Sequence, residues 1–198
     1  MGVYALVQLM DGRAVSSGLD TTINVWNLIS CTCELTLSEQ FGKLQHILEM
    51  KDGRIASASD ENSIKIWNTS SGLCEMTITE PFSSLVCAVR LSDGNIASSN
   101  NFGQVTVWDV NIGTPLVRFL ANRGRCDYDR FCMLQLTDGR LVSGSTDQRV
   151  KIWNVNSGLC EMTLVGNYDS IRCLLQLSDG RIACGGMNGK VTIWSLNK

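Results

Sequence analysis

Apolar and polar residues alternate over short segments of this chain, and polar, glycine-containing turns separate these segments. Leu85, Cys87, Val89 and Leu91 form one face of an alternating run, which predicts a β-strand. A helical spacing of three and four residues is sustained nowhere, so no helix is expected. Further strands are predicted at 95–100, 104–110 and 114–120. Together the four segments predict an antiparallel four-stranded meander.

An Asp-Gly pair follows the first strand of the meander and repeats along the chain. Such pairs tolerate the positive φ angles of two-residue type I′ hairpins, so we expect a tight turn of that kind. The pair begins at Asp11, Asp52, Asp93, Asp138 and Asp179. A tryptophan follows each aspartate by 15 residues, at Trp26, Trp67, Trp108, Trp153 and Trp194. The interval is 41 residues except for 45 before Asp138, so five units repeat and segment 121–131 carries four extra residues.

A meander that is apolar on both faces must stack against copies of itself, and radial stacking of such sheets gives a β-propeller. The period, the Asp-Gly turn, the strand sequences "IKIWN" and "VTVWD", and the glycine that follows them resemble the WD-repeat (WD40) β-propeller family. The resemblance covers essentially the whole chain and implies an all-β fold of about five four-stranded antiparallel blades in a single domain, 1–198. The units are placed at about 1–39, 40–80, 81–121, 122–166 and 167–198.

The fifth unit is expected to be incomplete. Trp194 falls in its third strand, only four residues before the end of the sequence, so this blade should have three strands and an open edge. Three arrangements stay open. The chain forms a small ring with one thin blade, forms an open arc from a larger propeller, or completes itself by association through the open edges of the first and fifth units. The ring is slightly favoured.

The buried polar network that the family resemblance implies is only partly present. In the family a tryptophan, a serine or threonine, an aspartate and a histidine are hydrogen-bonded in each blade. The histidine is missing here from every unit, although the serine column is retained in four units and becomes cysteine in the fifth. The column reads Ser16, Ser57, Ser98, Ser143 and Cys184. We therefore expect packing, rather than this network, to hold the blades, and a modest stability.

Composition narrows the class of protein. The chain has 44% hydrophobic and 18% charged residues and a net charge of −2, which argues against a nucleic-acid-binding or membrane surface. The N-terminal segment lacks the features of a signal peptide, and no apolar run is long enough for a transmembrane helix. Nine cysteines, an odd number, favour free thiols in a reducing compartment. An intracellular, cytoplasmic protein is expected, with the nucleus left open.

Two repeated columns in the predicted first strands of the units are candidates for chemistry. One reads Ala5, His46, Cys87, Cys132 and Cys173. It suggests either a ring of cysteine and histidine ligands around a metal near the axis or repeated core packing. Packing is favoured because the Cys-x-x-Cys spacing of zinc sites is absent. The other column reads Gln8, Glu49, Arg90, Gln135 and Gln176. It suggests either a polar binding site on the axis or a wet channel with a Glu49–Arg90 contact, and the channel is favoured. No catalytic motif occurs, so neither catalysis nor a cofactor or metal is expected.

Aromatic residues and arginines are expected on the rim opposite the Asp-Gly turns. These residue types are enriched among interface hot spots, and departures from a regular repeat often lie on a binding face. The predicted partner-binding set is Phe41, Phe82, Phe102, Arg123, Arg125, Tyr128, Arg130 and Tyr168. Alternatively, the aromatic side chains wedge between blades and the arginines form a solvated basic run.

The resemblance implies a non-catalytic scaffold that presents this rim to a protein or peptide partner of unknown identity. The alternative is a substrate-recognition module of a ubiquitin ligase, reading acidic or phosphorylated peptides through the arginines. A hydrolase that uses the axial polar column is the least favoured reading. Neither nucleic acid nor a membrane is an expected partner.

Overall fold

The computed structural model describes residues 2–18, 20–38, 42, 44–80, 84–122, 131–166 and 169–196. Within these ranges the regular structure consists of β-strands arranged in five antiparallel sheets, which we call blades. The first four blades have four strands each and the fifth has three, which confirms the predicted all-β fold with an incomplete last blade.

The strands follow one another in chain order within each blade. The first blade contains β1 (Val3–Gln8), β2 (Ala14–Gly18), β3 (Ile23–Asn27) and β4 (Thr32–Leu37). The second contains β5 (Leu44–Glu49), β6 (Ile55–Ser59), β7 (Ser63–Trp67) and β8 (Cys74–Thr79). The third contains β9 (Leu85–Arg90), β10 (Ile96–Asn100), β11 (Gln104–Asp109) and β12 (Thr114–Leu120). The fourth contains β13 (Phe131–Gln135), β14 (Leu141–Ser145), β15 (Arg149–Trp153) and β16 (Cys160–Val165). The fifth contains β17 (Ile171–Gln176), β18 (Ile182–Gly186) and β19 (Val191–Trp194).

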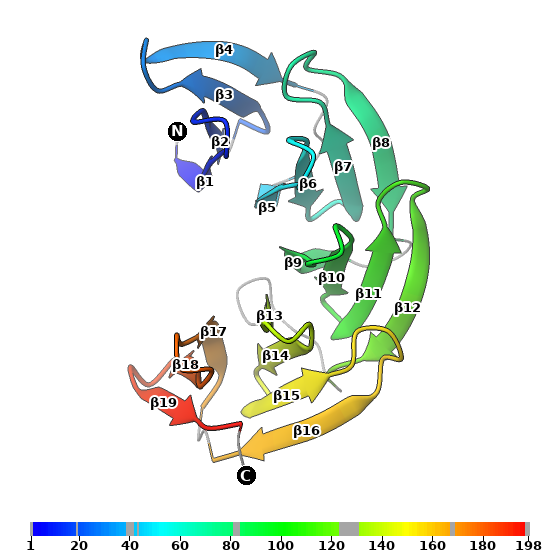
Figure 1. Cartoon of the computed structure of the whole chain (residues 1–198), viewed down its shortest axis with the longest axis vertical. Helices are drawn as coiled ribbons and strands as arrows, with labels where there is room; N and C mark the ends of the chain where they lie inside the picture. The colour runs from blue at the N-terminus through cyan, green and yellow to red at the C-terminus, as the bar shows by residue number, and fades with distance from the viewer. Residues whose placement is uncertain are drawn as a thin grey trace.

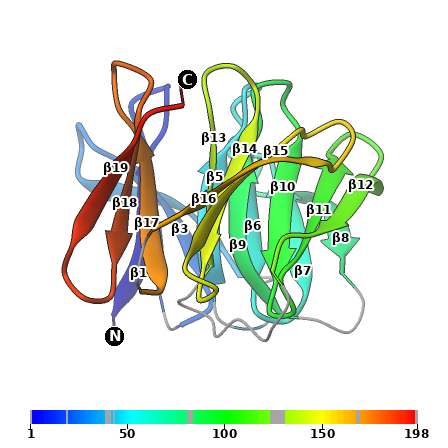
Figure 2. The same ribbon diagram turned by 90° about the horizontal axis from the view of Figure 1, so that it is seen from below.

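The blades are arranged around a common axis, with the first strand of each blade innermost (Figure 1). Strands β4, β8, β12 and β16 lie on the outside, and Figure 2 shows the blades side by side, turned relative to one another. The first and fifth blades stand apart at the two ends of an open arc (Figure 1). The five-bladed ring that the sequence slightly favoured is therefore not formed.

Apolar side chains between neighbouring blades form the core. Each of four clusters joins residues of adjacent sheets. Between the fourth and fifth blades, Val150 and Ile152 are fully buried against a face that includes Ile171. Complete burial of such side chains stabilises a fold by about 1.5–3 kcal/mol each. Packing between blades therefore contributes substantially to stability.

The two ends of the arc lack this packing. Val191 and Ile193 of the fifth blade are 69% and 50% exposed, whereas Val150 and Ile152 in the same columns of the fourth blade are 0% exposed. At the other end Leu6 is 71% exposed, although Ile47 in its column is 5% exposed. Each end of the arc therefore presents an apolar sheet face of the kind that is covered everywhere else.

The tryptophan and serine columns meet inside the blades as the family pattern implies. The indole Nε1 of Trp67 donates to Oγ of Ser57 over 2.9 Å, and the first, third and fourth blades have the same bond. In the fifth blade Cys184 replaces the serine, and the indole N–H of Trp194 has no oxygen acceptor among the described residues. Part of the polar network is thus retained despite the missing histidines.

The Asp-Gly turns have a geometry different from the predicted type I′ hairpin. In the third blade Gly94 N donates to the carbonyl of Leu91 over 3.0 Å, and Leu91 N donates to the carbonyl of Asn95 over 2.8 Å. Gly94 has a φ of 97°, whereas Asp93 is not among the residues with positive φ. The loop is therefore a three-residue turn that ends in a glycine bulge, a known alternative hairpin closure. The aspartate instead accepts a hydrogen bond from the backbone N–H two residues later.

Candidate functional site

A polar network covers the face of the arc that carries the Asp-Gly turns. In the second blade Arg54 Nε donates to Asp52 Oδ2 over 2.8 Å, and Arg54 Nη1 lies 3.5 Å from Glu75 Oε2. Asn68 Nδ2 donates to the other oxygen of Glu75 over 2.9 Å. The hydrogen bond from Arg54 lowers the pKa of Asp52, and Asp52 in turn raises the pKa of Arg54. Equivalent arginines in the first and fourth blades, Arg13 and Arg140, have the same partners.

The third blade keeps the aspartate of this network, as Asp93, but has different residues at the other three positions. Asn95 occupies the place of the arginine, Leu116 that of the glutamate, and Asp109 that of the asparagine. Asn95 Nδ2 donates to Asp93 Oδ2 over 2.9 Å, but no described cation forms an ion pair with Asp93. This turn therefore carries a carboxylate without the arginine that neutralises its counterparts.

The arginine of the first blade also joins two blades together. Arg13 Nη1 donates to the carbonyl of Thr69 over 2.8 Å, and Nη2 donates to the Thr69 hydroxyl over 2.9 Å. In the second blade, Arg54 instead contacts the carboxylates of its own blade, Asp52 and Glu75. The cleft between the first and second blades, which Arg13 partly fills, has a volume of about 200 Å³.

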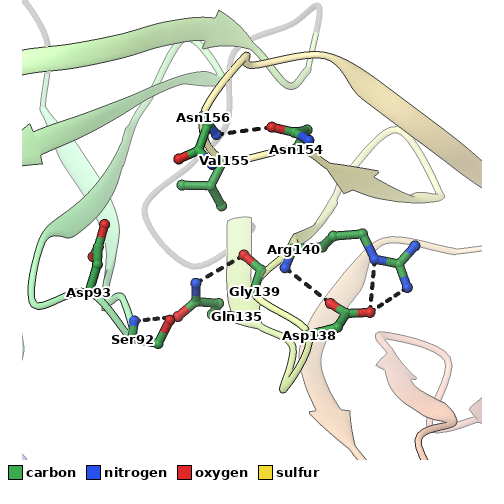
Figure 3. Close-up of a pocket in the computed structure, with 9 residues that line it drawn as sticks. All are labelled: Ser92, Asp93, Gln135, Asp138, Gly139, Arg140, Asn154, Val155 and Asn156. Carbon is green, nitrogen blue, oxygen red and sulfur yellow. Dashed lines mark hydrogen bonds and ion pairs between the residues drawn. The ribbon is translucent and has the colours of Figure 1, made fainter.

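The matching cleft between the third and fourth blades is larger, about 260 Å³. Asn95 is too short to reach across it as Arg13 does. Asp93 lies on one side of this cleft, and the Arg140–Asp138 pair lies on the other (Figure 3). The lining residues are Ser92, Asp93, Gln135, Asp138, Gly139, Arg140, Asn154, Val155 and Asn156. We take this cleft as the candidate functional site, because it is where the repeat on this face changes.

Gln135 fixes the base of the cleft. Its Oε1 accepts a 2.6 Å hydrogen bond from Ser92 N in the third blade, and its Nε2 donates over 3.0 Å to the carbonyl of Gly139 in the fourth (Figure 3). Arg140 on the same side donates twice to Asp138 Oδ2, over 2.9 and 2.6 Å. The walls are thus held by direct contacts, and the cleft is formed before any ligand arrives.

The contact made by Gln135 belongs to a repeated link between blades. Glu49 accepts from Met10 N over 2.6 Å, and Gln176 accepts from Thr137 N over 2.9 Å. Arg90, in the same column, has no acceptor atom and cannot make this bond. At that interface the direction is reversed, and the Lys51 ammonium donates to the carbonyl of Ser92. The expected Glu49–Arg90 contact is therefore wrong; the axial polar column mainly ties each blade to the turn of the one before it.

Comparison with known proteins agrees with this architecture. The model of the family "WD domain, G-beta repeat" matches residues 130–154 and 158–195, which fall in the fourth and fifth blades. These two segments therefore match the WD40-repeat family, and the arc as a whole has the fold of a WD40 propeller. A solved structure, the WD40 beta propeller domain of Doa1, superposes with a TM-score of 0.80 at 22% sequence identity, over 96% of this chain. This chain spans 62% of that structure's length. No curated protein sequence matches it.

An axial cavity of about 610 Å³ lies among the inner strands of the WD40 blades. His46, Cys87, Cys132 and Cys173 contribute to its wall. Burial lowers the pKa of His46 and raises the pKa of Cys87 to about 12, so the imidazole is neutral and the thiol protonated at physiological pH. Among the residues that the structure describes, no group of three or more histidine, cysteine or acidic side chains could hold a metal ion.

Only one residue of the predicted partner-binding rim falls within the described part of the chain. Phe102 lies in the loop between β10 and β11, at the end of the blade away from the Asp-Gly turns, and is 53% exposed. The other members lie outside the described residues: Phe41, Phe82, Arg123, Arg125, Tyr128, Arg130 and Tyr168. The rim as a whole therefore stays a prediction.

Sequence reasoning did not identify the cleft between the third and fourth WD40 blades. A signal was nevertheless present, because Asp-Gly-Arg in four units becomes Asp-Gly-Asn at Asn95, and Cys-Glu in three units becomes Pro-Leu at Leu116.

In the described ranges, no helix is both long enough and apolar enough to cross a membrane.

Proposed function

We propose that this WD40 protein is a non-catalytic scaffold that binds a protein or peptide partner. WD40 domains generally bind protein partners, and the family is generally non-catalytic. The observation that carries the proposal is the cleft between the third and fourth blades, where an otherwise repeated network changes and leaves a preformed polar cavity. Preformed clefts with a few directed polar groups are typical binding sites.

The chemistry of the described side chains supports binding rather than catalysis. A nucleophile or general base needs a suitable pKa and access to a substrate. Burial raises the pKa of the axial thiols of Cys87 and Cys132, which keeps them protonated and weakly nucleophilic. In the cleft, Arg140 and Asp138 neutralise each other. The hydrolase reading of the axial column loses support, because Glu49, Gln135 and Gln176 hold neighbouring turns.

The predicted rim forms part of the same proposal. Phe102 presents an exposed ring on the face opposite the cleft. Recognition of phosphorylated peptides, as in the ubiquitin-ligase alternative, depends on Arg123, Arg125 and Arg130, which lie outside the described residues. The cleft itself does not favour phosphate, because Asp93 adds a negative charge there and forms no ion pair with a described residue.

Selection of peptides from a random display library tests the proposal. The immobilised protein should enrich a sequence motif, and a synthetic peptide with that motif should bind in isothermal titration with a micromolar Kd. Phe102→Ala tests the rim, with Ile29→Ala as the matched control, since Ile29 is 97% exposed on the opposite face. Failure to enrich any motif, or turnover of a substrate in a broad activity screen, would contradict the scaffold assignment.

Self-association through the open ends is a second proposal, and the exposed end faces support it. Val191 and Ile193 present an apolar surface whose equivalents are buried in the other blades. The link between blades is also incomplete at the ends: the Gln8 side chain and the Ser178 N–H have no hydrogen-bond partner among the described residues. Sedimentation velocity across a hundredfold range of concentration should show a dimer that Ile193→Lys abolishes. A monomer at every concentration would refute it.

A further inference from the structure

We propose that the cleft between the third and fourth blades binds the guanidinium group of an arginine side chain from a protein partner. The inference rests on the proposed scaffold function and names the chemistry that the partner presents. It comes from comparing this cleft with its copy between the first and second blades, where the protein's own Arg13 occupies the corresponding space.

The intramolecular arginine shows what such a cleft accepts. The Arg13 guanidinium forms an ion pair with Asp11 Oδ2 at 2.7 Å and donates across the cleft to the carbonyl and hydroxyl oxygens of Thr69. A planar guanidinium carries five N–H donors in a fixed fork, so one group can satisfy acceptors on both walls at once. The side-chain exposure of Arg13 is only 19%, which shows that the cleft encloses most of it.

The cleft of the third and fourth blades keeps the carboxylate of that arrangement. Asp93 stands in the place of Asp11, and Val155 occupies the repeat position of Thr69, without its hydroxyl group. Two hydrogen bonds from Asn95 reach the Asp93 carboxylate, at 3.0 and 2.9 Å, but a carboxylate has about four acceptor positions. What is missing is the guanidinium, because position 95 is asparagine.

The charges around the cleft favour a cation. Arg140 is bound by Asp138 at 2.6 Å, so that pair adds no net charge, whereas Asp93 has no ion pair with any described residue. The Lys51 ammonium donates to the neighbouring carbonyl of Ser92 and is not paired with Asp93. A guanidinium is preferred to an ammonium here, because its forked donors can span two walls, as those of Arg13 do between the first and second blades, whereas a point charge on one stem cannot.

Binding of a minimal probe tests the site directly. N-acetyl-arginine amide is titrated into the isotopically labelled protein while backbone amide signals are followed by NMR, with N-acetyl-citrulline amide as the neutral isostere. Arginine should shift the amides of Ser92, Asn95, Gly139 and Asn156, and citrulline should bind at least about tenfold more weakly, since hydrogen bonds to charged groups are roughly twice as strong as neutral ones. Equal binding of the two probes would overturn the proposal.

Substitutions at positions 95 and 93 separate occupancy of the cleft from its charge. Asn95→Arg supplies the missing arginine from within the chain and should reduce probe binding at least about tenfold by neutralising Asp93. Asn95→Ala keeps the cleft open and should retain binding, while Asp93→Asn should lose it. Each variant is used only if its circular dichroism and melting temperature match the wild type. Unchanged binding by folded Asn95→Arg would overturn the inference.

The failure of this inference is distinguishable from failure of the scaffold function. If display-selected peptides bind equally to the wild type and to Asn95→Arg, the protein is still a scaffold but the cleft is not its arginine site. If the arginine probe binds at the cleft and no peptide motif is ever enriched, the site is correct and the scaffold proposal fails.

Discussion

Gln135→Ala should weaken the interface between the third and fourth blades. The wild-type side chain accepts from Ser92 N at 2.6 Å and donates to the Gly139 carbonyl at 3.0 Å. An average hydrogen bond contributes a net ~0.5–1.5 kcal/mol, and the Ser92 end of this pair is exposed to water. We therefore expect a loss of about 1–2 kcal/mol in the free energy of unfolding, equivalent to roughly 2–8 °C in melting temperature for a chain of this size.

Gln8→Ala is the matched control for this prediction. Gln8 occupies the same column in the first blade, but its side chain has no hydrogen-bond partner among the described residues. Urea unfolding followed by tryptophan fluorescence should place the midpoint of Gln135→Ala below the wild type, with that of Gln8→Ala unchanged. Equal midpoints for the two variants would refute the assignment of this column as a link between blades.

Three further predictions address the interior and the turns. Ser57→Ala leaves the buried indole N–H of Trp67 without an acceptor and should lower the free energy of unfolding by about 1–3 kcal/mol; a chemical-denaturation midpoint equal to that of the wild type would contradict this. Iodoacetamide at pH 8 should alkylate the exposed Cys160 and leave the buried Cys87, whose pKa is raised to about 12, unmodified until urea is added; mass spectrometry of digested protein distinguishes the two. The pKa of Asp52 is lowered by its arginine, so the pair stabilises the fold above about pH 4 and loses this effect as the pH falls through the lowered pKa. Asp52→Asn should therefore be less stable than the wild type at pH 7, and this difference should shrink as the pH falls below about 4, whereas a difference that does not change with pH would count against the ion pair.

Much of the fold could be predicted because its determinants are local and repeated. Alternation defined the strands, the Asp-Gly and tryptophan intervals defined five units, and the position of Trp194 predicted a three-stranded last blade. The turn was predicted less well. Type I′ and bulged hairpins both place glycine after aspartate, and they differ in the backbone angle of Asp93, which the residue type does not determine.

The features that depend on neighbouring blades could not be read from one unit. The curvature of the arc follows from packing between sheets, so the sequence did not distinguish an open arc from a ring. The role of Gln135 depends on Ser92, which is 43 residues away in the chain. The cleft has a visible signal in Asn95, but its meaning emerges only when Arg13 is seen to cross between blades. The partner-binding role of the aromatic rim, Phe102 included, is a prediction still to be tested.

Hydrogen–deuterium exchange with a display-selected peptide bound tests the central claim most directly, because it locates the partner on the arc without prior assumption. The account predicts that the peptide slows amide exchange at residues 92–95, 138–140 and 154–156, which surround the cleft, and that Asn95→Arg removes this protection. Protection confined to other parts of the arc, or protection at the cleft that survives in Asn95→Arg, would contradict the account.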